Sequence, residues 1–206
     1  MLNPSLKQYE YYRTDKGVLY HGDCLEIMPH LEPVDLVLTD PPYPDYYTEK
    51  YKYCESKILL LHELKCKQFV FWTSKFDFVL DYSAVHIWDK KTGCGSQYER
   101  IFERNGDKNY KVYSYYFINS TVAASFVGDV FTGHPSQKPK QLILKLLEDS
   151  KTNGLVYDPF LGSGTTAVAC ERLNRRWIGI EISEAYCKIA AERIERERSQ
   201  RKFKGF

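Results

Sequence analysis

The chain has 206 residues, of which 43% are hydrophobic and 15% aromatic, and its 29 basic and 27 acidic side chains give a net charge of +2. This length and composition suit one globular domain spanning residues 1–206 and exclude a disordered or fibrous chain. No apolar run approaches the ~18 residues of a membrane span, and the N-terminus lacks the apolar core of a secretory signal. We therefore expect a cytoplasmic protein without membrane contact.

Short apolar runs alternate with helical patterns in the first two thirds of the chain, which is typical of a parallel α/β sheet. The expected strands there are residues 18–21, 34–39, 68–73, 84–88 and 112–118. The expected helices are residues 24–31 and 55–65, and a short helical stretch is expected between residues 73 and 84.

The last third continues the alternation. Pro139 suits the first turn of a helix over residues 139–150, which is expected to end near Asn153 and Gly154. A strand over residues 155–157, a helix over 165–173 and a strand over 176–182 follow. Ser183 then caps a long C-terminal helix. The pattern predicts seven strands in all.

The spacing of the cysteines argues against a zinc ribbon or a redox dithiol, while their even number leaves a disulfide framework formally possible. None of the six forms a CxxC pair, and they stand at positions 24, 54, 66, 94, 170 and 187. Because nothing else indicates secretion, we interpret them as reduced thiols and expect no metal.

Basic charge is concentrated in two segments. Residues 90–140 hold eight basic and four acidic side chains with nine aromatics, and residues 188–206 hold seven basic and three acidic. Cations interleaved with aromatics suit the phosphates and unstacked bases of a nucleic acid. A solvated surface beside a β-rich core is the alternative.

A rigid polar turn follows the second expected strand, with the sequence Asp40-Pro41-Pro42-Tyr43. Two prolines fix the backbone and leave carbonyls without competing donors. A carboxylate and a carbonyl held together can accept both hydrogens of an amino group, and Tyr43 can stack on the ring that carries it. Such acceptors stabilise the charge that grows on a reacting exocyclic amine.

A glycine-rich turn follows the strand over residues 155–157 and reads DPFLGSGTT from Asp158 to Thr166. No Lys follows Gly164, so it is not a P-loop. The next strand ends at Glu181, where an acid can bind a ribose diol. Together these features favour a nucleoside ligand without a pyrophosphate.

These motifs resemble those of the amino-methylating DNA methyltransferases that use S-adenosylmethionine, in the beta group where the catalytic motif precedes the cofactor motif. Similar segments are HPSQKP at residues 134–139, GIEISEA at 179–185, Gly22-Asp23 and IWDK at 87–90, so the resemblance spans about residues 18–195. It implies a Rossmann-like methyltransferase domain with a circularly permuted, mostly parallel seven-stranded sheet flanked by helices.

The resemblance also implies site residues. The catalytic residues would be Asp40, Pro41, Pro42 and Tyr43. Asp23 would face the cofactor adenine, Glu181 would bind the ribose, and Thr165 and Thr166 would hold the methionine carboxylate, with Ser136 and Lys138 near it. The remaining cofactor residues would be Cys24, Asp158, Phe160, Gly162, Ser163, Gly164 and Ile182.

The implied reaction is methyl transfer to adenine N6 of a flipped base in double-stranded DNA. Cytosine N4 offers the same chemistry, but that branch tends to carry Ser in place of Asp40. RNA is a further substrate class, although the permuted motif order favours DNA. A non-catalytic nucleic-acid-binding subunit of the same fold would be expected to lose the catalytic acid or the cofactor glycines, and both are intact here.

The chain has little length for a DNA-reading insert. We expect short recognition elements within residues 45–53, where Tyr46 and Tyr47 stand, and 91–111, together with a homodimer. The expected phosphate contacts are Lys90, Lys91, Arg100, Arg104 and the tail from Arg193 to Lys204.

Overall fold

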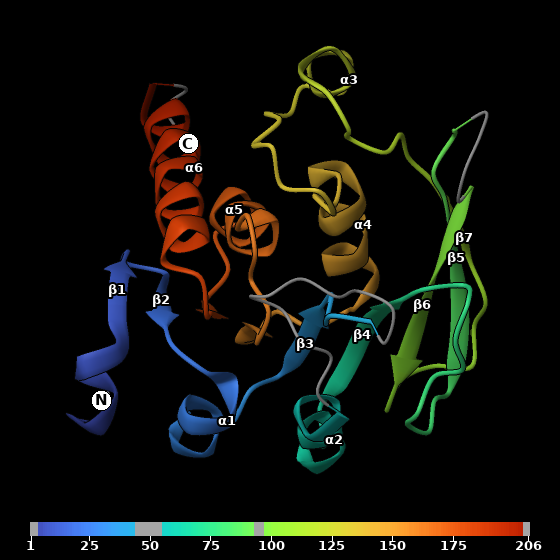
Figure 1. Cartoon of the computed structure of the whole chain (residues 1–206), viewed down its shortest axis with the longest axis horizontal. Coiled ribbons are helices and arrows are strands. Elements are labelled where there is room, and N and C mark those ends of the chain that lie inside the picture. Colours follow the sequence, from blue (N-terminus) through green and yellow to red (C-terminus); the bar gives the residue numbers. More distant parts are fainter. Residues whose placement is uncertain (1–3, 44–54, 93–96, 204–206) are drawn as a thin grey trace.

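The computed structural model describes residues 4–43, 55–92 and 97–203. Through these segments runs one sheet in the order β1-β2-β9-β8-β3-β4-β6-β5-β7 (Figure 1). Its strands are β1 (Glu10–Arg13), β2 (Gly17–His21), β3 (Leu36–Thr39), β4 (Lys67–Trp72), β5 (Ala84–Asp89), β6 (Tyr98–Arg104), β7 (Val112–Ser114), β8 (Val156–Asp158) and β9 (Trp177–Glu181).

The sheet is mostly parallel, as predicted, but it has nine strands and not seven. Neighbouring strands from β2 through β9, β8 and β3 to β4 all pair in parallel. The two unexpected strands, β1 and β6, pair with their neighbours in antiparallel fashion. Both carry charged side chains in place of an apolar run, which is why the sequence pattern did not reveal them.

Helices cover both faces of the sheet. They are α1 (Cys24–Ile27), α2 (Glu55–Glu63), α3 (Thr121–Phe126), α4 (Lys140–Asp149), α5 (Thr165–Arg172) and α6 (Glu184–Phe203), with 3-10 turns at Pro4–Tyr9 and Met28–His30. Figure 1 shows α4, α5 and α6 on one side of the sheet and α1 and α2 on the other. Among the described residues, no helix is both long and apolar enough to cross a bilayer.

Some local predictions are wrong, among them the strand expected over residues 112–118, which ends at Ser114. The segment between β4 and β5 contains no helix, because Trp72 Nε1 donates to the carbonyls of Phe76 and Asp77 and holds it as an irregular turn. Helix α4 has Pro139 as its N-cap, not in its first turn. It ends at Asp149, so the expected range 139–150 is right to within a residue, but its C-cap is Ser150 and not the expected Asn153, because Lys151 adopts a left-handed φ of 57°.

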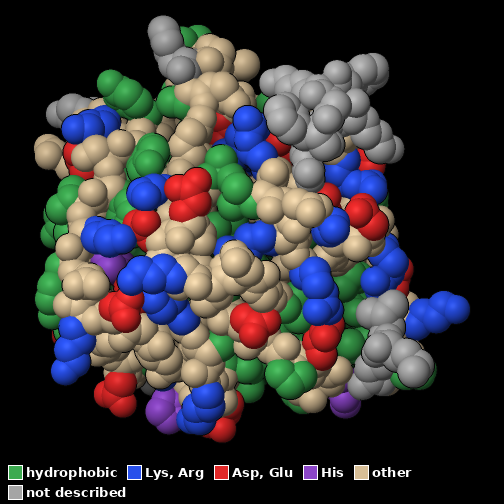
Figure 2. All heavy atoms as spheres, turned by 180° about the vertical axis from the view of Figure 1, so that it is seen from behind, with side chains coloured by type: hydrophobic (Ala, Val, Ile, Leu, Met, Phe, Trp, Pro, Cys, Tyr) green, Lys and Arg blue, Asp and Glu red, His purple; other side chains and the backbone are tan. Residues whose placement is uncertain are grey.

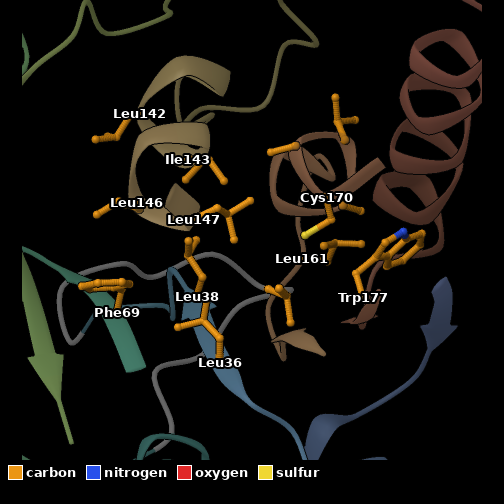
Figure 3. Packing of buried hydrophobic residues seen from close by; sticks show 14 of the residues in the cluster. Leu36, Leu38, Phe69, Leu142, Ile143, Leu146, Leu147, Leu161, Cys170 and Trp177 are labelled. Carbon is orange, nitrogen blue, oxygen red and sulfur yellow. The ribbon is translucent and has the colours of Figure 1, made fainter. Parts of the chain in front are cut away.

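The core on the α4 side joins that helix to the middle of the sheet. Leu142, Ile143, Leu146 and Leu147 of α4 face Leu36, Leu38 and Phe69 of β3 and β4 (Figure 3). This packing fixes the start of α4 above the carboxyl ends of the parallel strands. The described cysteines, Cys24, Cys66, Cys170 and Cys187, are free thiols, whereas Cys54 and Cys94 lie outside the described residues.

Candidate active site

The two predicted functional turns lie side by side. They follow β3 and β8, which pair in parallel, so both leave the same edge of the sheet. The hydroxyl of Thr39, the last residue of β3, donates to Asp158 Oδ1 at 2.7 Å and joins the two turns directly. Residues more than a hundred positions apart in the chain thus form one site.

One cavity receives both turns. Predicted residues that line it are Asp40, Pro41, Pro42, Tyr43, Cys24, Ser136, Lys138, Asp158, Phe160, Gly162, Ser163, Thr165, Thr166, Glu181 and Ile182. The fold therefore brings the expected amine-binding turn and the expected nucleoside-binding turn to a common space.

Two predicted cofactor residues, Asp23 and Gly164, are not among the lining residues. Asp23 is the N-cap of α1, accepting from the N–H of Leu25 at 3.0 Å, and it pairs with Lys57 Nζ at 2.8 Å. Gly164 is the N-cap of α5 with a left-handed φ of 83° and packs against Ala190 of α6. In this structure both residues therefore lie outside the cavity surface and support elements that border it.

Asp40 is held by two donors. Its Oδ1 accepts from the hydroxyl of Tyr43 at 2.5 Å, and its Oδ2 accepts from the ammonium of Lys138. Burial raises the pKa of Asp40; the charge of Lys138 opposes this shift and that of Glu99 adds to it. Tyr43 packs edge-on against Trp72, with 5.5 Å between ring centroids. The carboxylate is thus fixed at the strand end.

The glycine turn and Glu181 support one another. Glu181 Oε2 accepts from the N–H of Gly162 at 2.8 Å, and Oε1 accepts from the N–H of Ser183 at 2.8 Å. Gly162 has a φ of 53°, and a Cβ there would lie 3.2 Å from His134 Nε2. A side chain at this position would enter the space beside the turn, so glycine is required for the close approach.

Two further groups have shifted pKa values. Burial raises the pKa of Asp158 to about 6, although hydrogen bonds from Thr166, Thr39 and the N–H of Phe160 oppose the shift. Burial lowers the pKa of His134 to about 4, helped by the charges of Lys138 and Arg193. His134 is therefore neutral at pH 7.

Sequence reasoning missed several residues of the cavity. His134 lies within the quoted HPSQKP segment but was not assigned a role, and Lys57 and Phe71 also line the cavity. Glu99 contacts Lys138 from β6, at 3.4 Å between Oε2 and Nζ. Of these residues, only His134 stands in a motif that the sequence reveals. Lys57, Phe71 and Glu99 reach the site through the packing of strands and helices.

The structure corrects two of the four predicted DNA contacts. Lys90 is 7% exposed and pairs with Glu99 at 2.7 Å. Arg104 is 4% exposed and donates to the carbonyls of Leu61 and Asp81. Both cations are used inside the protein, so they are withdrawn as phosphate contacts.

The other two predicted contacts differ from each other. Arg100 donates to the carbonyl of Thr73 at 2.7 Å and to that of Phe76, which ties β6 to the turn after β4. Lys91 is exposed and pairs with Asp89 at 3.1 Å. Of the four, Lys91 alone presents its charge on the surface.

The expected recognition segments also change. Residues 45–53 lie outside the described residues, and 98–104 within the segment 91–111 form β6 inside the sheet. In the C-terminal tail, Arg193 is buried and donates to the carbonyl of Ser163 at 2.7 Å. On the face in Figure 2, basic and acidic side chains are interspersed and form no continuous basic patch among the described residues.

An open α/β sheet with this cavity outside its strand ends is the architecture of a Rossmann-like methyltransferase. The family model for N6/N4 DNA methylases matches residues 48–192. The chain belongs to this family of S-adenosylmethionine-dependent DNA methyltransferases.

Two curated relatives align with nearly the whole chain. The type II methyltransferase M2.DpnII of Streptococcus pneumoniae is 26% identical, with 91% of this chain and 92% of the relative covered. The type II methyltransferase M.ScaI of Streptomyces caespitosus is also 26% identical, with 91% and 84% covered.

Solved structures share the fold. The PvuII DNA methyltransferase, described as cytosine-N4-specific, superposes with a TM-score of 0.68 at 17% identity, covering 90% of this chain and 88% of that chain. The M1.HpyAVI complex with S-adenosylmethionine superposes with a TM-score of 0.60 at 26% identity, covering 85% and 98%.

Proposed function

We propose that this chain methylates the exocyclic N6 of adenine in double-stranded DNA, on a base flipped out of the helix into the cavity beside Asp40. The observation that carries the proposal is the single cavity that holds the Asp40–Tyr43 turn together with Glu181 and the glycine turn. S-adenosylmethionine, when bound, supplies a methyl group made electrophilic by its sulfonium sulfur.

The catalytic turn acts on the amine. Asp40 and the carbonyl of Pro41 accept its two hydrogens, which favours a pyramidal nitrogen whose lone pair is available for attack. Pro42 keeps the turn rigid, and Tyr43 stacks on the base. These preorganised acceptors stabilise the positive charge that develops on the nitrogen.

The residues present also fit the cofactor. Glu181 accepts hydrogen bonds from the ribose hydroxyls, since a carboxylate offers about four acceptor positions. Thr165 and Thr166 meet the methionine carboxylate at the N-terminus of α5, near Ser136. Neutral His134 places no positive charge against a cationic sulfonium. The other cofactor contacts that we propose are Cys24, Phe160, Gly162, Ser163 and Ile182, with Asp23, Asp158 and Gly164 supporting them.

Asp40 is the reason for preferring adenine. The related cytosine-N4 enzymes tend to carry Ser at this position, and cytosine N4 is the second candidate target. The structural likeness to a cytosine-N4 enzyme has 17% identity and shows the fold alone.

For DNA contact we propose Lys91 and Lys75. Both are exposed in segments that leave the same sheet edge as the cavity, after β5 and β4. We retain the proposals of one catalytic domain over residues 1–206 and of a homodimer, because a lone domain of this size offers little surface against the ~1,000–2,500 Å² typical of a specific DNA interface.

The test is Asp40→Ala. Removing one preorganised acceptor is expected to lower the methylation rate at least ~10²–10³-fold while S-adenosylmethionine affinity stays near that of the wild type. Asp15→Ala is the control, because Asp15 is 65% exposed and pairs with Arg198 away from the cavity. Asp40→Ala activity within twofold of the wild type would refute the assignment.

A further inference from the structure

Four charged side chains alternate in sign from the catalytic turn into the sheet: Asp40, Lys138, Glu99 and Lys90. Lys138 Nζ contacts Asp40 Oδ2 and lies 3.4 Å from Glu99 Oε2. Lys90 Nζ lies 2.7 Å from Glu99 Oε1. The side chains of Lys138, Glu99 and Lys90 are 7%, 12% and 9% exposed, so water screens these charges little.

The arrangement has a consequence for the incoming base. Lys138 and Tyr43 already donate to the two oxygens of Asp40, and each oxygen can accept one more hydrogen bond, so an incoming amino group either shares an oxygen with one of these donors or displaces it. Tyr43 is anchored against Trp72, whereas Lys138 has a second carboxylate within reach. Lys138 is therefore the donor better placed to leave Asp40, because its charge would remain paired with Glu99.

Glu99 is suited to receive the ammonium. Within the described segments its Oε2 has no hydrogen-bond partner, and Lys138 Nζ is its ion-pair neighbour. Lys90 fixes the other oxygen of Glu99. The rings of Phe71 and Trp88, with centroids 5.1 and 5.9 Å from Lys138 Nζ, keep the ammonium in a favourable environment during a short movement.

We propose that Lys138 and Glu99 are positioning residues for methyl transfer: Lys138 holds Asp40 ionised and oriented until the target amine takes Asp40 Oδ2, and then shifts to Glu99 Oε2. This inference rests on the proposed role of Asp40 and adds residues and a movement to it.

Electrostatics gives the pair opposite effects on Asp40. A buried carboxyl without a counter-ion takes up a proton and then no longer accepts from an amine with that oxygen. Lys138, from the loop before α4, lowers the pKa of Asp40, whereas Glu99, from β6, raises it. The other groups in this environment are Tyr43, Asp158 at the end of β8, and Lys90, which faces Glu99.

The test is the pH dependence of kcat/KM for methylation of DNA by the full chain. Lys138→Gln is expected to move the acidic limb to higher pH by about one unit or more, and Glu99→Gln to move it to lower pH. Glu99→Gln should also raise KM for DNA, since Lys138 then has no second carboxylate. Lys145→Gln, which removes an exposed ammonium on α4, is the control and should leave the limb in place.

Conservative variants separate positioning from folding. Lys138→Arg and Glu99→Asp keep the charges and are expected to return the acidic limb toward its wild-type position, and thermal unfolding reports whether each variant folds. The positioning roles of Lys138 and Glu99 are refuted if the acidic limbs of Lys138→Gln and Glu99→Gln move in the same direction, or if both limbs stay in place although the variants fold. If Asp40→Ala is inactive in that experiment, the proposed function of Asp40 still stands. An active Asp40→Ala would instead overturn the proposed function.

Discussion

Asp158 illustrates at the scale of one residue how a site can cost stability. It is 4% exposed at the end of β8, where burial raises its pKa to about 6. The folded protein then binds a proton that the unfolded chain, with a pKa near 3.9, has already released. Stability from this group is therefore present at low pH and is lost as the pH rises from about 4 through 6.

Asp158→Asn should remove this loss. The amide still accepts from Thr39 and the N–H of Phe160 without carrying a buried charge, so the variant is expected to be more stable than the wild type at pH 7.5 by up to roughly 3 kcal/mol. Near pH 4 the two proteins should be similar. Urea unfolding at both pH values measures this, and an equal pH dependence in the two would contradict it.

Glu181 is the residue whose replacement reports on the cofactor. Glu181→Ala removes the acceptor of the ribose hydroxyls and the support of Gly162, so S-adenosylmethionine affinity should fall by roughly 1.5–3 kcal/mol. Glu184→Ala is the matched control, because Glu184 is an exposed acid on the following helix. Calorimetry measures both, and unchanged affinity in Glu181→Ala would remove the ribose assignment.

At the scale of elements, Gly164 joins two helices. Its φ of 83° starts α5, and a Cβ there would lie 2.8 Å from Ala190 Cβ on α6. Gly164→Ala should therefore cost both the left-handed backbone and the clash, about 2–4 kcal/mol in all. Gly128 has a φ of 62° with open space around it, so Gly128→Ala isolates the backbone cost of about 1 kcal/mol. Equal losses in denaturant unfolding would show that the α5–α6 contact is unimportant.

The elements also show what local sequence encodes. The strands that carry the functional turns have apolar runs ending in Asp-Pro, and their position was predicted within two residues. Strand β6 reads YERIFER, and its charged side chains acquire partners only when β4 and β5 flank it. The same packing buries Arg104, so the prediction that it contacts DNA failed for lack of any local sign of burial.

At the scale of the whole molecule, the order of motifs along the chain does not limit the site. Asp40 and Asp158 meet because β3 and β8 are neighbours, and the motif resemblance was sufficient to predict that they share a cavity. Glu99 was beyond such reasoning, because its contact with Lys138 depends on the position of β6 in the sheet. The motifs thus predicted the residues that line the cavity, whereas the ion pair behind Asp40 could be found only from the three-dimensional structure.

DNA binding is expected at the sheet edge that carries the cavity, where Lys91 and Lys75 are exposed. Lys91→Glu and Lys75→Glu are each expected to weaken binding and to reduce the slope of log K against log salt by about 0.9. Charge reversal at Lys151, an exposed cation before β8 at the sheet edge opposite the cavity, is the comparison: Lys151→Glu should leave the slope unchanged. If neither Lys91 nor Lys75 changes the slope, the DNA lies on another face.

The homodimer is tested separately. Sedimentation at the concentration used for activity should give twice the 24.2 kDa of one chain. A fully active protein that sediments as a single 24.2 kDa species would remove the dimer.

The most direct test of the central claim is the nucleoside composition of DNA methylated by the purified protein. DNA is incubated with the protein and S-adenosylmethionine, digested to nucleosides and analysed by mass spectrometry, with Asp40→Ala in parallel. We predict N6-methyladenine with the wild type and a loss of at least ~10²-fold with Asp40→Ala. N4-methylcytosine without N6-methyladenine, or N6-methyladenine formed equally by Asp40→Ala, would contradict the account.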